Sequence, residues 1–375
     1  MSTPYRAIQW TKEKFVFDLA MVSGAGIYLV LFVAISFARS TAPDYVEIAT
    51  VLVRAFGTLA IILLHFVLAI GPMSRLNRSF LLLLANRRHL GVFTFLAAAV
   101  HGVLATLIYH SGGAMNPLAS IVLGNGQVFS SAEWPFEIFG FLAFLLLLLL
   151  AVTSHDFWMA YLSPIQWKRL HMLVYAAYAL VLLHVSLGVL QDTANPLYAI
   201  TIASGMLLLL WLHRKAAQKE MRIDATPPAV DSDGWVKVCQ PAEIPIGAAR
   251  IVNAGSERIA VFRHWQGISA LSNVCAHQGG PLGEGTMVAG CVRCPWHGSL
   301  FFPQTGVAPP PATHSVPTFE AKLVDGMIYV NPMPNPQGME VDPLLVPGQK
   351  GRAGHLGSTL RMDHGVVSPR RKEDR

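Results

Sequence analysis

The chain has 375 residues, of which 53% are hydrophobic and only 13% are charged. That length allows two or three domains, and the composition is too apolar for an ordinary soluble protein. The formal net charge of +6 could indicate a nucleic-acid partner, but the Lys and Arg residues stand in short clusters beside apolar segments. This distribution is typical of basic residues that orient a chain in a membrane. We therefore expect membrane lipid, and no nucleic acid, as a partner.

A polar N-terminal segment (residues 1–19) precedes six long apolar segments. They lie at about residues 20–38, 48–71, 90–109, 135–153, 169–190 and 198–212. A membrane-spanning helix needs about 20 apolar residues, with a range of about 17–25, so we expect a six-helix transmembrane α bundle over residues 20–213. The first segment exceeds the apolar core of a signal peptide, about 7–15 residues, and we interpret it as the first helix.

Basic residues mark one side of this expected bundle. The N-terminal segment, the segments 72–89 and 154–169 and the stretch after the sixth helix carry nearly all Lys and Arg of the flanks. The opposite segments (39–47, 110–134 and 191–197) hold only Arg39. The positive-inside rule then places both termini in the cytoplasm of a multi-pass protein of the cell membrane, the inner membrane of a bacterium.

Four histidines lie within the apolar segments: His65, His101, His171 and His184. Ionisable groups are costly in a membrane and are functional candidates, and His is a common haem ligand; the alternative for each is a histidine hydrogen-bonded between helices. His171 and His184 are thirteen residues apart, which is about 20 Å along a helix and suits one haem near each face of the membrane. By depth, His101 and His184 can share an outer haem, and His65 suits His171 on the inner side.

The segment after the helices changes character. Residues 214–233 run from basic to Pro-rich sequence and predict a helix end followed by a flexible tether. Short β-type runs separated by Gly and Pro then predict a small antiparallel β domain over residues 234–333. Residues 334–375 are rich in Pro, Gly and charge, and we expect a disordered tail.

Two short motifs in the β domain carry metal-ligand chemistry. Cys275-Ala-His277 is followed, after sixteen residues, by Cys294-Pro-Trp-His297. In a Rieske [2Fe-2S] cluster two Cys bind one iron and two His bind the other. Zinc fingers usually place both Cys in one arm and both His in the second, whereas each arm here mixes one Cys with one His. The pattern therefore favours the cluster, with a zinc site as the alternative.

The β domain resembles the Rieske ferredoxin domain from about Trp235 to Val330. The matching landmarks are Val274-Cys-Ala-His-Gln-Gly-Gly-Pro-Leu, Cys294-Pro-Trp-His-Gly, Phe301 and Thr305-Gly306. The resemblance implies that Cys275 and Cys294 bind one iron and that His277 and His297 bind the other.

The chain departs from the Rieske proteins of quinol-oxidising complexes in two respects. Those proteins carry a disulfide between the two loops, where this chain has Gly280 and Trp296, and a Tyr where this chain has Phe301. Because hydrogen bonds to the sulfurs are one determinant of the potential, we expect a potential between those of the ferredoxin and the quinol-oxidising groups.

The membrane part, about residues 20–212, resembles the ferric reductase-like transmembrane domain. This family includes the haem-binding subunit of the bacterial methionine sulfoxide reductase system, ferric reductases and NADPH oxidases. The resemblance rests on Arg87-Arg88-His-Leu-Gly91, His101, Thr153-Ser154-His-Asp156, Trp167-Lys-Arg-Leu-His171 and His184. It implies two b-type haems, with His101, His171 and His184 at ligand positions. Arg87 stands where many members have a further His, so the second inner ligand is left open between His65, which we favour, Arg87 and His89.

Two absences narrow the function. The sequence shows neither a Gly-x-Gly-x-x-Gly motif after a strand nor a 2-His-1-carboxylate set for a Rieske oxygenase. We therefore expect an oxidoreductase component with no catalytic residue of its own: a membrane electron-transfer protein. A separate cytosolic reductase would reduce the [2Fe-2S] cluster, and electrons would pass through b-type haems to an extracytoplasmic or quinone acceptor. The alternatives are inward flow from a quinol, and a haem-free anchor for a Rieske ferredoxin or redox sensor.

Overall fold

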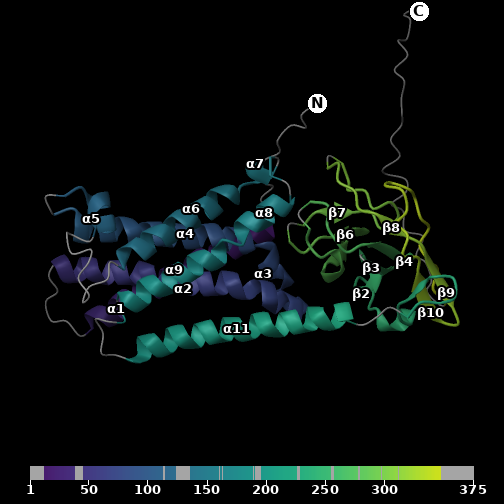
Figure 1. Ribbon diagram of the computed structural model, residues 1–375, viewed down its shortest axis with the longest axis horizontal. Coiled ribbons are helices and arrows are strands. Elements are labelled where there is room, and N and C mark those ends of the chain that lie inside the picture. Colours follow the sequence, from purple (N-terminus) through teal and green to yellow (C-terminus); the bar gives the residue numbers. More distant parts are fainter. Residues whose placement is uncertain are drawn as a thin grey trace, which may run out of the picture.

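The computed structural model describes residues 12–38, 45–112, 115–123, 136–159, 161–162, 164–188, 190, 196–225, 229–254, 257–277, 279–296, 298–310 and 312–347. Figure 1 shows an elongated helical bundle, coloured purple to teal, with a β domain in green and yellow at one end. The multi-domain architecture predicted from the sequence is thus confirmed.

In the part of the chain that the structure describes, six principal helices build the bundle. They are α1 (Lys12–Phe37), α2 (Tyr45–Leu76), α4 (Arg87–Ala105), α6 (Glu137–Thr153), α9 (Val174–Leu187) and α11 (Pro196–Ala225). Among the described residues, five apolar helical segments are long enough to cross a membrane, with α8 (Pro164–His171) extending α9 into one of them. The sixth, α6, is an apolar helix of 17 residues, the lower limit of about 17 for a spanning helix.

Short helices complete the bundle at its two ends. They are α3 (Leu81–Ala85), α5 (Pro117–Leu123), α7 (Asp156–Met159), a 3₁₀ turn at Arg78–Phe80 and a π-helical turn at Thr106–His110 that continues α4. The longest helix, α2, packs against α1, α4 and α11, and α6 packs against α4 and α9. Many large apolar side chains, such as Val30, Phe66 and Leu207, remain exposed on the outer faces, as expected of helices that face lipid.

The β domain consists of three antiparallel sheets, which confirms the predicted fold class. A four-stranded sheet has the order β2 (Ala249–Ala254), β3 (Glu257–His264), β4 (Gly267–Ser272) and β8 (Thr318–Phe319). A second sheet has the order β1 (Val236–Lys237), β10 (Met327–Val330) and β9 (Ala321–Val324). The third sheet has the order β5 (Thr286–Val288), β6 (Cys291–Arg293) and β7 (Leu300–Phe301), and it carries one of the two motif loops.

Three predicted boundaries differ from the structure. Helix α1 begins at Lys12, before the predicted residue 20, and α11 continues to Ala225, beyond the predicted end at 213. The extension of α11 is rich in Ala, Lys, Gln and Glu, which favour helix, so this part of the predicted tether is a helix. Residues 334–347 are not a disordered tail: Leu344 exchanges two backbone hydrogen bonds with Ile268. Residues 1–11 and 348–375 lie outside the described residues.

The extension of α11 is tied to the β domain. Arg258 on β3 contacts Glu220 at 2.6 Å and Asp224 at 2.5 Å, and the amide of Asn253 donates to the backbone carbonyl of Asp224. In Figure 1, β6 and β7 lie on the side of the β domain that faces the helices, near α8. The third sheet therefore faces the membrane part.

Candidate functional site

The two motif loops of the β domain have the same backbone geometry. In the first loop the amide of Cys275 donates to Gly280 at 2.8 Å, and the amide of Gly279 donates to Cys275 at 2.7 Å. In the second loop the amide of Cys294 donates to Ser299 at 2.8 Å, and the amide of Gly298 donates to Cys294 at 3.0 Å. Gly279 and Gly298 have positive φ angles of 70° and 75°, which a residue with a side chain rarely adopts.

These turns place both Cys side chains inside the domain. Cys275 and Cys294 are each only 2% exposed, and they pack in the same apolar cluster as Phe301 and Leu282. An apolar surrounding keeps water from the thiolates, and solvent exposure is one of the determinants of an iron–sulfur potential. The two predicted iron ligands are therefore in a site that can hold a cluster.

Of the two predicted histidine ligands of the cluster, His277 lies among the described residues. The ring of His277 is half-buried, with its centroid 5.5 Å from that of His314; His297 lies outside the described residues. Within the described part of the chain, no group of three or more His, Cys, Asp or Glu side chains is placed to hold a single metal ion. A Rieske cluster divides two Cys and two His between two irons, and the two loops bring Cys275 and Cys294 into one buried cluster of side chains.

Gly280 fits closely between the two loops. A Cβ at this position would lie 2.8 Å from the sulfur of Cys294 and 3.1 Å from Cγ of Trp296. Any larger side chain would therefore displace the sulfur of Cys294 or the ring of Trp296. None of the four Cys forms a disulfide, and burial raises the pKa of the Cys239 and Cys291 thiols, which favours their protonated form.

Trp296 joins the cluster-bearing loop to the membrane part. It packs against the cluster of buried side chains that contains Cys275 and Cys294, and also against one formed by α1, α2, α3 and α4. Nζ of Lys168 on α8 lies 6.0 Å from the centroid of the Trp296 ring. His171 lies one turn further along the same helix.

In the membrane part, the structure brings His101 and His184 together. These two residues, named the outer histidine pair after the position expected from the sequence, lie toward the C-terminal ends of α4 and α9. Their ring centroids are 6.2 Å apart. With metal–nitrogen bonds of about 2 Å, two imidazoles that share one metal as axial ligands have centroids roughly 6 Å apart. The spacing of the pair therefore fits a haem iron between the rings.

The hydrogen bonds of the pair fix its tautomer. Nδ1 of His101 lies 2.9 Å from the carbonyl oxygen of Val53, and Nδ1 of His184 lies 3.0 Å from that of Phe136. Because a carbonyl oxygen only accepts, both Nδ1 atoms carry the proton, and Nε2 of each neutral ring holds the lone pair. Metal-binding histidines usually donate their second ring nitrogen in this way.

Two glycines provide the space for these rings. A Cβ at Gly57 on α2 would lie 2.8 Å from Nδ1 of His101, and a Cβ at Gly140 on α6 would lie 2.7 Å from Nδ1 of His184. The sequence motifs did not single out Gly57 or Gly140. Other glycines of the spanning helices, such as Gly102, have no atom within 4 Å of an added Cβ, so the residue type alone could not have identified Gly57 and Gly140 from the sequence.

His171 is the histidine that the sequence analysis assigned to the inner haem. The ring of His171 stacks on Trp167 with centroids 3.9 Å apart, and Nε2 lies 3.3 Å from Oγ1 of Thr153. Arg87 is within electrostatic reach and also lies beside Gly71 on α2. Arg87 therefore lies near His171, although the sequence analysis favoured His65 as the partner of His171.

The expected pairing of His65 with His171 is not seen in the structure. Nδ1 of His65 donates to the carbonyl oxygen of Ile61 at 2.8 Å, so Nε2 is the acceptor for the hydroxyl of Tyr178, 3.0 Å away. The lone pair of His65 Nε2 thus accepts a hydrogen bond between α2 and α9. This is the alternative named for each of these residues, a histidine hydrogen-bonded between helices. Within the described residues, no hydrogen bond or ring contact joins the two histidines. His89 bonds to Asp18 on α1 at 2.9 Å.

Comparison with protein families divides the chain in the same way. Residues 56–182 match the ferric reductase like transmembrane component, and residues 234–320 match the Rieske [2Fe-2S] domain. In the membrane part the chain is 35% identical to the protein-methionine-sulfoxide reductase heme-binding subunit MsrQ of Xanthomonas campestris pv. campestris (strain B100). The match spans 175 residues, 46% of this chain and 74% of the relative.

The β domain has its own relatives. It is 35% identical over 98 residues to ferredoxin CarAc of Metapseudomonas resinovorans, which covers 26% of this chain and 92% of the ferredoxin. Among solved structures it is similar to a chain in the complex of reduced oxygenase and oxidised ferredoxin of carbazole 1,9a-dioxygenase, with 31% identity and a TM-score of 0.26. That match covers 28% of this chain and 97% of the solved one.

Proposed function

Since the chain belongs to the ferric reductase-like transmembrane family and carries a Rieske [2Fe-2S] domain, we propose that it transfers electrons across the cell membrane, between the cluster and b-type haems. The cluster and the haems supply one-electron redox chemistry when bound. The protein contributes the ligands, their orientation and a fixed contact between the two domains.

We assign the ligands as part of this proposal. Cys275 and Cys294 would hold one iron of the cluster, and His277 and His297 would hold the other. His101 and His184 would hold an outer haem, which is supported by their 6.2 Å spacing and by the similarity to the heme-binding subunit MsrQ. His171 would be a ligand of a second, inner haem, and Arg87 is within electrostatic reach of it.

The observation that carries the proposal is the position of Trp296. This residue follows Cys294 closely in the chain, and its side chain packs against the buried apolar cluster formed by α1 to α4. A cluster held by this loop would therefore lie beside the membrane helices rather than in open solvent. A domain that acted only as an anchored sensor would not need its cluster loop packed against the helices that carry the histidines.

The orientation is part of the proposal. Basic residues concentrate at the end of the bundle that meets the β domain, with Arg75, Arg87 and Arg88 on α2 and α4 and Lys215 and Lys219 on α11. The positive-inside rule places this end in the cytoplasm. We assign the electron donor to a separate cytosolic reductase and the acceptor to an extracytoplasmic compound or a quinone.

Two measurements test this function. The haem content of the purified chain, determined as the pyridine haemochrome, should be about two per chain; about one would leave only the His101 and His184 site, and none would reduce the helices to an anchor. Inside-out vesicles should then show haem reduction by a nicotinamide-driven cytosolic reductase. Reduction by a quinol alone would instead establish inward flow.

A further inference from the structure

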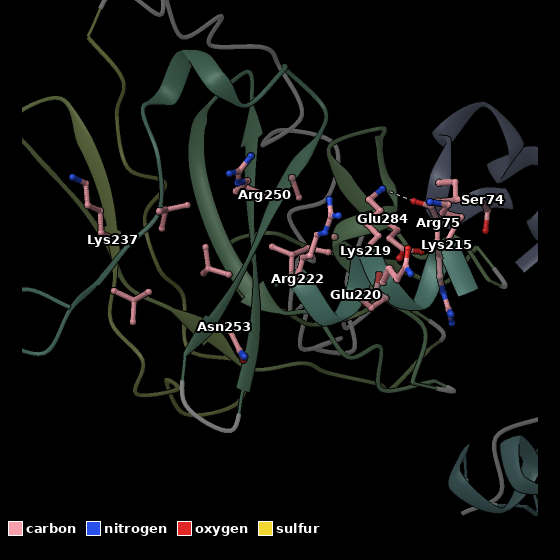
Figure 2. Close-up of a pocket in the computed structure, with 18 of the residues that line it drawn as sticks. Ser74, Arg75, Lys215, Lys219, Glu220, Arg222, Lys237, Arg250, Asn253 and Glu284 are labelled. Carbon is pink, nitrogen blue, oxygen red and sulfur yellow. Dashed lines mark hydrogen bonds between the residues drawn. The ribbon is translucent and has the colours of Figure 1, made fainter. Parts of the chain in front are cut away.

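A cavity of about 890 Å³ lies where the helical bundle meets the β domain. One wall comes from the end of α2 (Ser74, Arg75 and Leu76) and from the extension of α11, and the opposite wall comes from β1, β2 and Gly283–Glu284. Figure 2 shows the labelled side chains of both walls around this space. The volume lies within the range of about 300–1,000 Å³ that is usual for ligand sites.

The cavity is strongly basic. Its lining includes six cationic side chains and two carboxylates, an excess of four positive charges. The cationic residues are Arg75, Lys215, Lys219, Arg222, Lys237 and Arg250, and the acidic ones are Glu220 and Glu284. The carboxylate of Glu220 is already engaged by Arg258, which is not part of the lining, at 2.6 Å. The net charge therefore favours an anion.

The position of the cavity relative to the membrane indicates the source of that anion. The segments of α2 and α11 that are long and apolar enough to cross a membrane end at Leu76 and Arg222. The lining residues of these two helices lie at those ends, where charged residues follow the apolar part: Ser74, Arg75 and Leu76 on α2, and Lys215, Gln218, Lys219, Glu220 and Arg222 on α11. Phospholipid headgroups lie at this level of a membrane. Basic pockets between helices on the cytoplasmic side are typical sites for anionic headgroups.

We propose that this cavity binds the phosphate of an anionic phospholipid headgroup, with α11 and β2 as its two walls. Leu76, Val236, Val238 and Ile251 supply apolar surface beside the charges, which suits the glycerol and upper acyl part of a lipid. A free phosphate or nucleotide offers the same anionic chemistry without an apolar part.

Because the cavity has walls from both domains, its ligand binds only when the domains are docked. Any ligand that binds one arrangement and not the other stabilises it by mass action. An anionic lipid in the cavity therefore holds the β domain, with its Cys275 and Cys294 loops, against the membrane helices. This role does not depend on the haem content of the bundle.

The test compares the full chain with two double variants. Arg222→Gln with Arg250→Gln removes one cation from each wall, whereas Arg169→Gln with Arg214→Gln removes two exposed cations from α8 and α11 outside the lining. Each protein in detergent micelles is titrated with short-chain phosphatidylglycerol, phosphatidylcholine or potassium phosphate, and binding is followed by native mass spectrometry. Hydrogen exchange of β2 reports docking.

We expect phosphatidylglycerol to bind and to slow hydrogen exchange in β2, and the Arg222/Arg250 variant to bind it roughly ten- to thirtyfold more weakly. The Arg169/Arg214 control should bind as the parent does. Phosphate alone binding with the same dependence on Arg222 and Arg250 would support the anion site with a soluble source. Equal binding of phosphatidylcholine, or equal weakening in both double variants, would overturn the proposal. Arg250→Gln alone, on the exposed surface of β2, keeps the test valid if the double variant does not fold.

Discussion

Replacing Gly140 with Ala tests the outer histidine pair at its closest contact. The new Cβ would lie 2.7 Å from Nδ1 and 2.8 Å from Cε1 of His184, whereas carbon atoms pack best at about 3.5–4.0 Å. The imidazole would therefore have to move by roughly 1 Å. Metal sites tolerate deviations of about 0.2 Å in ligand distance, so a shift of this size would prevent His184 from holding the proposed haem.

The cost to the fold is smaller than the cost to the site. Moving the ring breaks the 3.0 Å bond to the carbonyl of Phe136, worth about 1 kcal/mol, and overpacking adds about 1–3 kcal/mol. The better helix propensity of Ala offsets at most about 1 kcal/mol. We therefore expect a destabilisation of roughly 1–3 kcal/mol, which leaves most of the chain folded.

The assay is haem content and the optical spectrum of the purified variant. Gly140→Ala should lose about one haem per chain, with the cluster signal in electron paramagnetic resonance retained. Gly102→Ala is the matched control, because Gly102 follows His101 in α4 and a Cβ there would meet no atom within 4 Å. A Gly140→Ala protein with full haem content and an unchanged spectrum would refute the ligand geometry.

Three further changes test other parts of the structure. Gly280→Ala places a Cβ 2.8 Å from the sulfur of Cys294, so we expect loss of bound iron and of the cluster signal; full iron content would contradict this. Arg258→Gln removes two ion pairs to α11, which are partly exposed and together worth about 1 kcal/mol. We expect faster hydrogen exchange at the end of α11. Unchanged exchange there would contradict the role of Arg258 in holding α11 to the β domain. Burial lowers the pKa of His264 from 6.5 to about 4. The unfolded chain thus binds a proton between those values that the folded domain does not, and stability falls as the pH drops through that window. His264→Gln should remove that loss, measured by hydrogen exchange of β3 and β4 against pH, and an equal loss in the variant would exclude His264 as its cause.

The sequence predicted the cluster loops because their information is local. Cys275 and His277, like Cys294 and His297, are separated by one or two residues, and a short turn holds such a pair together whatever surrounds it. The contact of Trp296 with α1 to α4 joins segments that are far apart in the chain. No spacing rule predicts it, and only the packed structure shows that the cluster loop meets the membrane helices.

The helices were predictable because lipid requires long apolar segments, but their ends were not. Hydropathy detects only the apolar part of α11, whereas the helix continues to Ala225 in residues that favour helix without being apolar. The same limit applies to the direction in which a side chain points from its helix. Depth along the helices paired His101 with His184, which the structure brings together, but depth alone could not show that His65 faces Tyr178.

The most direct measurement is the rate of haem reduction with and without the cluster. The full chain in nanodiscs is mixed with a nicotinamide-driven reductase in a stopped-flow spectrometer, and Cys294→Ser serves as the variant that cannot hold the cluster. We predict that the cluster bleaches first and the haem band rises after it in the parent, whereas the haems of the variant stay oxidised, although dithionite reduces them. Haem reduction at the same rate in both proteins would contradict transfer from the Rieske domain to the membrane helices.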